Sequence, residues 1–154
     1  MKRQLTKLLN ITGINIKGQK QLENTLILEL ENNSRKASCP RCKKISYRLH
    51  QNHYSLIKDI PWGKTDFFLR VNRRQFKCDN CLKPFSEELD FVKKRQKHTE
   101  RYAKFITEQV VNSDLKSVAK RNNLTESEIE STIGADESKN FTHKFKLLEK
   151  IRDR

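Results

Sequence analysis

The sequence predicts an α+β protein, with β structure in residues 1–97 and a small bundle of helices after them. Three observations lead to this prediction. Apolar and polar residues alternate in several stretches of the first part, a pattern typical of half-buried strands. Four cysteines stand in that part as two short pairs. From His98 onward, apolar residues recur instead at steps of three and four, the period of an amphipathic helix.

The cysteine pairs are the strongest chemical signal in the chain. Cys39 and Cys42 flank Pro-Arg, and Cys78 and Cys81 flank Asp-Asn. Two such turns facing each other present four thiolates as a tetrahedron, which suits zinc and leaves no open position for catalysis. One structural Zn²⁺ ion is therefore predicted on these four residues. A redox pair and an iron–sulfur site remain open as alternatives.

The 35 residues between the two pairs must form an ordered excursion that returns the chain to its start. Residues 47–60 and 66–77 are predicted as antiparallel strands joined by a Pro61-Trp62-Gly63 turn. The whole insert is therefore expected to be a zinc-ribbon-like β module. His50 and His53 in this insert could replace a zinc ligand, but a surface position is the other interpretation of each.

A β-hairpin is predicted before the first cysteine pair. Ile14 and Ile16 alternate with polar residues on one side of a Gly18-to-Asn24 loop, and residues 26–30 do so on the other. Leu5, Leu8 and Leu9 precede it, either as a helical turn or as an irregular lead-in.

The last third predicts a helix-turn-helix bundle. Thr99 and Asp114 are expected as N-caps of the first two helices, and Asn122-Asn123-Leu124 as the turn that follows. Thr125 then opens a third helix, with Glu128 at the capping-box position. We therefore expect four segments. They are an N-terminal hairpin (1–38), a zinc-binding β-ribbon (39–97), a helix-turn-helix bundle (98–133) and a basic tail (134–154).

The charge of the chain is +14 and is concentrated in the middle: +4 in residues 1–38, +9 in 39–98 and +1 in 99–154. Such a field favours a polyanion, most simply nucleic acid, although a solvated basic surface is the alternative. Three groups of basic residues are candidate DNA contacts: Arg41, Lys43, Lys44 and Arg48; Arg70, Arg73, Arg74 and Lys77; and Lys93, Lys94, Arg95 and Lys97. For the third group, a solvated linker is an equally good interpretation.

The third helix is acidic, and its glutamates would be repelled by phosphates deep in a major groove. Either Lys120 and Arg121 of the second helix make the DNA contacts, or the bundle is a packing and partner element, which is the interpretation we favour.

Several function classes are not expected. No apolar run is long enough for a membrane span and no signal peptide is evident, so we expect a cytoplasmic protein whose cysteines bind metal rather than form disulfides. The sequence contains no Gly-rich phosphate loop, nucleophile elbow or nucleophile–base pair. No catalytic residue and no small-molecule substrate are therefore predicted.

The segments CPRC, RLHQNH, KDIPW, VNRRQFKCDNC and KPFSEELDFVKKR resemble the N-terminal region of bacterial insertion-sequence transposases of the ISL-three type. The resemblance runs from about Leu5 to Ile133. It implies that the four cysteines bind zinc and that this region recognises double-stranded DNA at the ends of the element. In that family, a catalytic domain of RNase H-like fold follows, in which three acidic residues hold divalent metal.

The sequence departs from the family pattern after Ile133. In the family a connecting segment separates the helix-turn-helix from the Gly-x-Asp-Glu that opens the catalytic domain, whereas here Gly134-Ala135-Asp136-Glu137 follows Ile133 directly. Asp136 thus aligns with the first catalytic acid, and a basic amphipathic stretch takes the place of the catalytic strands. We therefore expect a truncated, DNA-binding fragment that lacks strand-transfer activity. A second copy or a full-length transposase is a further candidate partner. The rival interpretation is a zinc-ribbon module that binds protein or RNA through a non-specific basic surface.

Overall fold

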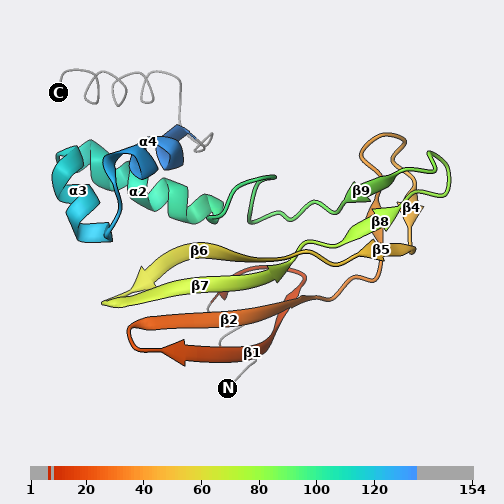
Figure 1. Ribbon diagram of the computed structural model, residues 1–154, viewed down its shortest axis with the longest axis horizontal. Helices are drawn as coiled ribbons and strands as arrows, with labels where there is room; N and C mark the ends of the chain where they lie inside the picture. Colours follow the sequence, from red (N-terminus) through yellow and green to blue (C-terminus); the bar gives the residue numbers. More distant parts are fainter. Residues whose placement is uncertain (1–6, 8, 135–154) are drawn as a thin grey trace. The chain divides into compact units, whose positions relative to one another are not determined.

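The computed structural model describes residue 7 and residues 9–134 (Figure 1). The chain divides into two compact units, residues 1–97 and residues 98–154. The first unit is β structure and the second is helical in its described part, so the predicted α+β class is confirmed. The expected lead-in at Leu5 and Leu8 and the Asp136-Glu137 pair lie outside the described residues, as does the tail beyond Gly134.

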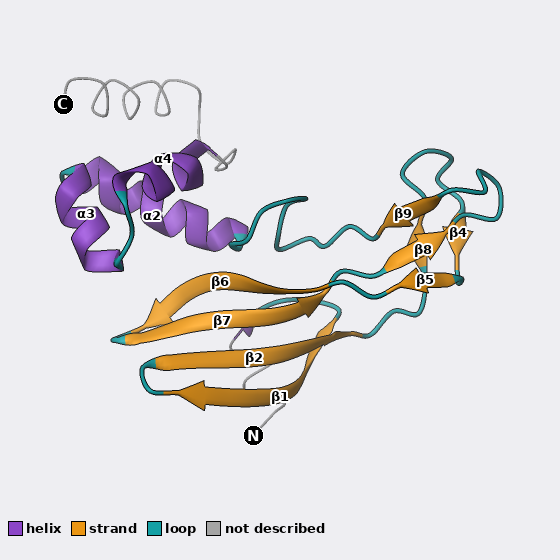
Figure 2. Ribbon diagram, viewed as in Figure 1, coloured by secondary structure: helices purple, strands orange, loops and turns teal. Residues whose placement is uncertain are grey.

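A four-stranded sheet forms the larger part of the first unit (Figure 2). Its strands are β1 (Ile14–Leu22), β2 (Thr25–Asn32), β6 (Tyr54–Trp62) and β7 (Thr65–Asn72), in the order β1-β2-β7-β6. Both hairpins, β1–β2 and β6–β7, are antiparallel, as their alternating sequences predict.

The first hairpin is longer than the sequence indicates. Residues 18–24 were expected to be a loop, but β1 continues through a bulge between Ile16 and Gly18 and pairs with β2 as far as Leu22 and Thr25. Only Glu23 and Asn24 form the turn, and Glu23 has a φ of 47°. Beyond the bulge both faces of β1 are exposed, so most of its residues there are polar and do not alternate with apolar ones. The sequence pattern therefore could not indicate a strand there.

The two hairpins join through parallel pairing between β2 and β7, from Thr25 opposite Asp66 to Glu29 opposite Arg70. The sequence separates residues 1–38 from residues 39–97, whereas the structure places both hairpins in one sheet and in one unit. The apolar faces of the two hairpins share one core, so each hairpin depends on the other for its stability. The buried members of this core are Leu9, Ile14, Ile16, Leu28, Leu30, Ile57, Phe67, Leu69, Val71 and Val92.

Two small sheets lie at one end of the large sheet (Figure 1), and each has one cysteine pair in the turn between two of its strands. One pairs β3 (Ala37–Ser38) with β4 (Ile45–Ser46), and the other has the order β5-β8-β9. The bounds of the latter strands are Leu49–Gln51 for β5, Gln75–Lys77 for β8 and Pro84–Ser86 for β9. The two long strands predicted from the sequence therefore each break in two, at residues 52–53 and 73–74, where the chain passes between sheets.

The second unit contains α2 (Glu100–Asn112), α3 (Leu115–Asn122) and α4 (Glu126–Gly134). The predicted caps are confirmed. The Thr99 hydroxyl accepts a hydrogen bond from the Tyr102 amide at 3.2 Å, and the Asp114 carboxylate accepts one from the Ser117 amide at 3.1 Å. Asn123 adopts the left-handed conformation that ends α3.

The capping box of α4 forms as expected. The Thr125 amide donates to the Glu128 carboxylate at 2.7 Å, and the Glu128 amide donates to the Thr125 hydroxyl at 3.2 Å. Ile106, Val118 and Ile129, one from each helix, are fully buried and form the centre of the bundle. None of the described helices is long and apolar enough to cross a membrane.

Candidate metal centre and basic surface

The two cysteine pairs fold into the same turn twice. In each turn the amide of the residue after the second cysteine donates to the carbonyl of the first cysteine: Lys43 to Cys39, and Leu82 to Cys78, both at 2.9 Å. The amide of the first cysteine in turn donates to the carbonyl two residues beyond the second one, at 2.9 and 3.1 Å. We call these turns the first knuckle (residues 39–44) and the second knuckle (residues 78–83).

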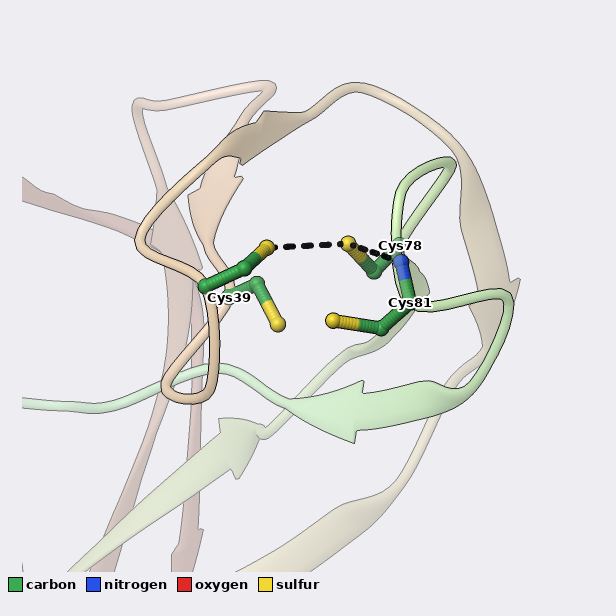
Figure 3. Close-up of side chains that lie close together, drawn as sticks. Cys39, Cys78 and Cys81 are labelled. Atoms are coloured by element: carbon green, nitrogen blue, oxygen red, sulfur yellow. Dashed lines mark hydrogen bonds between the residues drawn. The ribbon is translucent and has the colours of Figure 1, made fainter.

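The knuckles face each other with their sulfur atoms turned inward (Figure 3). The Sγ atoms of the four cysteines all lie within 4.8 Å of one another, and the Cys42 and Cys78 Sγ atoms are 3.5 Å apart. A zinc ion bound at ~2.3 Å by four sulfurs separates neighbouring sulfurs by ~3.8 Å. The donor set and its spacing therefore fit one tetrahedral zinc ion, which would cross-link the two knuckles.

The knuckle backbone favours thiolates at two of the four positions. Hydrogen bonding by the Cys42 backbone amide lowers the pKa of Cys39, and the Lys44 backbone amide lowers the pKa of Cys42 to about 6. Cys81 differs, because its thiol hydrogen-bonds to the Cys42 sulfur and burial adds to the effect, so its pKa is raised to about 11. Zinc binding by all four thiolates must therefore displace protons from the cluster.

Parallel pairing in the large sheet explains why the knuckles meet. Because β2 and β7 run in the same direction, the segments that follow them emerge from the same end of the sheet. The first knuckle begins soon after β2 and the second soon after β7. The insert of 35 residues predicted to return the chain does so through the β6–β7 hairpin.

Basic residues of the first predicted group surround the metal centre and bridge the knuckles. The Arg41 guanidinium donates to the carbonyls of Lys83 and Pro84 at 3.2 and 3.3 Å, and the Lys44 ammonium donates to the Asn80 side chain at 3.3 Å. The Arg48 guanidinium lies 3.5 Å from the Asp79 carboxylate, with both side chains largely exposed. Lys43 is exposed at the end of the first knuckle. All four remain predicted DNA contacts.

The second group is divided by burial. The Arg74 guanidinium makes two hydrogen bonds to the Glu87 carboxylate, at 2.9 and 2.8 Å, and the two side chains are only 15% and 4% exposed. Glu87 also accepts from the Asn32 side chain at 3.2 Å, so this ion pair ties the large sheet to the segment after β9. Arg74 therefore has a structural role that the sequence did not predict.

The other members of the second group have different surroundings. The Arg70 guanidinium lies over the Tyr54 ring at 4.3 Å and 3.5 Å from the Glu29 carboxylate, on the face of the large sheet. Arg73 is half-buried and donates to two backbone carbonyls. Lys77 is half-buried in β8, where its carbonyl accepts from the buried Ser46 hydroxyl.

The third group follows an isolated bridge between Leu89 and Val92. Lys94, Arg95 and Lys97 are exposed and Lys93 is half-buried. The segment is not a loose linker along its whole length, because the Lys97 carbonyl accepts from the Lys58 amide of β6 at 2.9 Å.

The aromatic residues near the metal centre differ in burial. Phe85 is buried with Phe76 and the cysteines in a small second core, whereas Phe91 packs against the core of the large sheet. Tyr47 is 71% exposed and precedes Arg48 in the chain. The sequence pattern did not single it out as a surface residue. His50 and His53 are both exposed.

Comparisons with known proteins match two stretches of the chain. Residues 35–81 match the family model described as the zinc-finger of transposase IS204/IS1001/IS1096/IS1165. Residues 87–133 match the helix-turn-helix domain of transposase family ISL3. Together with the sulfur cage, the first match shows that the chain binds a structural zinc ion.

One curated relative is the transposase for insertion sequence element IS1001 of Bordetella parapertussis, which is 25% identical over 96 residues. The aligned region covers 62% of this chain but only 24% of that transposase. No solved structure matches the chain.

Proposed function

The chain carries the N-terminal zinc-ribbon and helix-turn-helix region of ISL3-type transposases, and from this premise we propose that it binds double-stranded DNA at the terminal repeats of its insertion element. The observation that supports this proposal best is that several cations lie on or beside the two zinc-binding knuckles. Arg41, Lys43, Lys44 and Arg48 all lie on or beside the knuckles. Cations on a rigid support can follow successive phosphates along a duplex. The proposed location is the cytoplasm, where the bacterial transposases that the chain resembles meet DNA.

The helical unit contributes to binding through α3 more than through α4 in this proposal. Lys120 and Arg121 are exposed in the last turn of α3. In α4 the Glu128 carboxylate is engaged by the capping box, while Glu126 and Glu130 stay on the exposed surface. Replacing Lys120 and Arg121 together by Gln should weaken DNA binding. If binding is unchanged, the bundle is a packing and partner element instead.

A gel-shift titration with element-end DNA and a scrambled duplex of the same composition tests recognition. Stronger binding to the terminal repeat is expected, together with a steep fall in affinity as salt rises. Equal affinity for both duplexes would remove the specific role and leave only general DNA binding.

We also propose that the 154-residue chain binds DNA ends without cutting or joining them. Among residue 7 and residues 9–134, the four cysteines are the only group of three or more side chains close enough to hold a metal ion. A two-metal site for phosphoryl transfer needs converging carboxylates. Incubation of the purified chain with element-end DNA and Mg²⁺ or Mn²⁺ should give no nicked or joined product, and the appearance of either would contradict this part of the proposal.

A zinc-ribbon module that binds RNA or protein is the second candidate. Three exposed apolar side chains, Ile45, Tyr47 and Leu49, favour it, because they lie at alternate positions around β4 and β5. A shallow dependence of DNA affinity on salt, with RNA competing at least as well as DNA, would support this candidate over the first.

A further inference from the structure

A groove of about 490 Å³ lies in the first unit, between the first knuckle, strands β8 and β9, and the segment that leads to Lys97. It brings together members of all three predicted basic groups: Arg41 from the first, Arg73 from the second, and Lys93 and Lys94 from the third. Pro40 and Pro84 lie on its wall. These cations are far apart in sequence, so their convergence could not be read from the charge pattern.

Both arginines of the groove are held by backbone carbonyls. The Arg41 Nη2 atom donates to Lys83 and Pro84, and the Arg73 Nη2 atom donates to Val92 and Lys93, each within 3.3 Å. A guanidinium has five N–H donors in a planar fork, so one anchored nitrogen leaves donors on the others. Anchoring also removes much of the entropy that a long side chain loses when it binds an anion.

The lining of the groove carries a net positive charge. The lining contains four cations and two acids, Glu87 and Glu88. The Glu87 carboxylate is bound by Arg74 and Asn32 and also acts on Arg73 through its charge, and the four cations exceed the two acids even when both acids are counted. Burial lowers the pKa of Arg73, which shows that its guanidinium is poorly solvated. A poorly solvated cation gains more from an anion than one in bulk water.

We propose that this groove is a phosphate seat, in which Arg41 and Arg73 hold one backbone phosphate of DNA from two sides and Lys93 and Lys94 neutralise its neighbours. This inference rests on the proposed DNA binding and adds the place where the backbone is fixed. Paired hydrogen bonds from a planar fork match phosphate oxygens, and such a contact sets the position of a protein on the duplex.

The test uses the full-length zinc-loaded chain and four variants. Arg41→Gln and Lys94→Gln remove one cation each from the groove, and Arg41→Lys keeps the charge but replaces the planar fork of five donors by three donors on one nitrogen. Lys20→Gln on β1 is the matched control, because Lys20 is exposed and lies outside the groove lining. Zinc content and thermal unfolding are measured for every variant, since Arg41 lies between two zinc ligands.

DNA affinity is measured over a range of salt concentrations, and the free protein is titrated with inorganic phosphate while NMR follows the Arg41 and Arg73 side chains. Arg41→Gln should weaken DNA binding about tenfold. It should also reduce the slope of log affinity against log salt by about one. Arg41→Lys should fall between Arg41→Gln and the wild type, and Lys20→Gln should match the wild type.

Each outcome decides the inference. Wild-type affinity and slope in both Gln variants of the groove would overturn it while leaving DNA binding intact. Absence of DNA binding with clear phosphate shifts at Arg41 and Arg73 would keep the seat and overturn the proposed function. If neither DNA nor phosphate binds, both proposals are wrong.

Discussion

At the scale of single residues, Lys43 and Leu82 hold equivalent positions in the two knuckles. Both have positive φ values, 64° and 59°, because each follows the second cysteine of its pair and turns the chain back toward the first. The left-handed conformation costs an L-residue about 1–2 kcal/mol. Leu82 is also 70% exposed, so it gives up little packing if its side chain is removed.

Leu82→Gly should therefore stabilise the zinc-loaded protein by about 0.5–1 kcal/mol, the relief of strain less the entropy cost of glycine. Lys43→Gly should give a similar gain in stability but lose DNA affinity, since Lys43 is a predicted phosphate contact. Urea unfolding monitored together with gel shifts checks both variants. A loss of stability in Leu82→Gly would show that the leucine side chain makes a contribution larger than the strain.

The basic residues differ sharply in their expected roles. Arg74→Ala should destabilise the chain by about 3–5 kcal/mol, because it leaves the buried Glu87 carboxylate without the guanidinium that pairs with it. Arg48→Ala is the matched control: its ion pair with Asp79 is exposed, with side chains 64% and 73% accessible, so the loss should stay below ~1 kcal/mol. Urea unfolding of the two variants gives the comparison, and equal losses would contradict it.

Several of these roles could be predicted from the sequence only in part. The cysteine ligands follow from spacing, since two pairs with no other cysteine in the chain leave few alternatives. All twelve candidate DNA contacts look alike as charges in the sequence. What separates Arg74 from Arg48 is the position of Glu87, thirteen residues beyond Arg74, and spacing alone cannot show that its carboxylate is buried.

At the scale of secondary-structure elements, the helix caps could be predicted from the sequence, whereas the extent of β1 and the long-range pairing of strands could not. The caps at Thr99, Asp114 and Thr125 depend on contacts over three residues, so the sequence contains all that is needed to predict them. The parallel pairing of β2 and β7 joins residues 25–29 to 66–70, and no short-range pattern specifies it. The boundary expected after residue 38 separates two hairpins that this pairing joins in one sheet.

The capping box of α4 permits a direct measurement. Thr125→Ala should destabilise the helical unit by about 1 kcal/mol, because the Glu128 amide loses its acceptor. Ser127→Ala in the exposed first turn of α4 is the control and should have little effect. Thermal unfolding followed by far-UV circular dichroism gives both values, and identical melting temperatures for the two variants would argue against the capping contribution.

At the scale of the whole molecule, the described residues contain three separate apolar cores. One lies under the large sheet, one surrounds the cysteines, and the third lies within the helices. Only the second depends directly on metal, because Phe76 and Phe85 pack there against Cys39 and Cys78. The cores should therefore respond differently to the loss of zinc.

Removal of zinc by a strong chelator, or Cys78→Ser, should unfold the knuckles while the helices persist. Amide hydrogen exchange should show lost protection in β3, β4, β5, β8 and β9 and retained protection in α2. The single tryptophan, Trp62, stacks on the buried Phe67 at 4.7 Å and reports on the large sheet by fluorescence. Unchanged exchange in the knuckles after complete loss of zinc would show that the metal is not structural.

The parallel strands β2 and β7 have a further consequence for how the ion is retained. Six residues separate Asn32 from Cys39 and five separate Asn72 from Cys78. Each cysteine pair is therefore joined by a short segment to the same four-stranded sheet. A thiolate that dissociates stays at high effective concentration and recaptures the ion before the ion escapes. Exchange of the ion with solution should therefore be much slower in the full chain than in a peptide of residues 35–86, which lacks the β1–β2 hairpin.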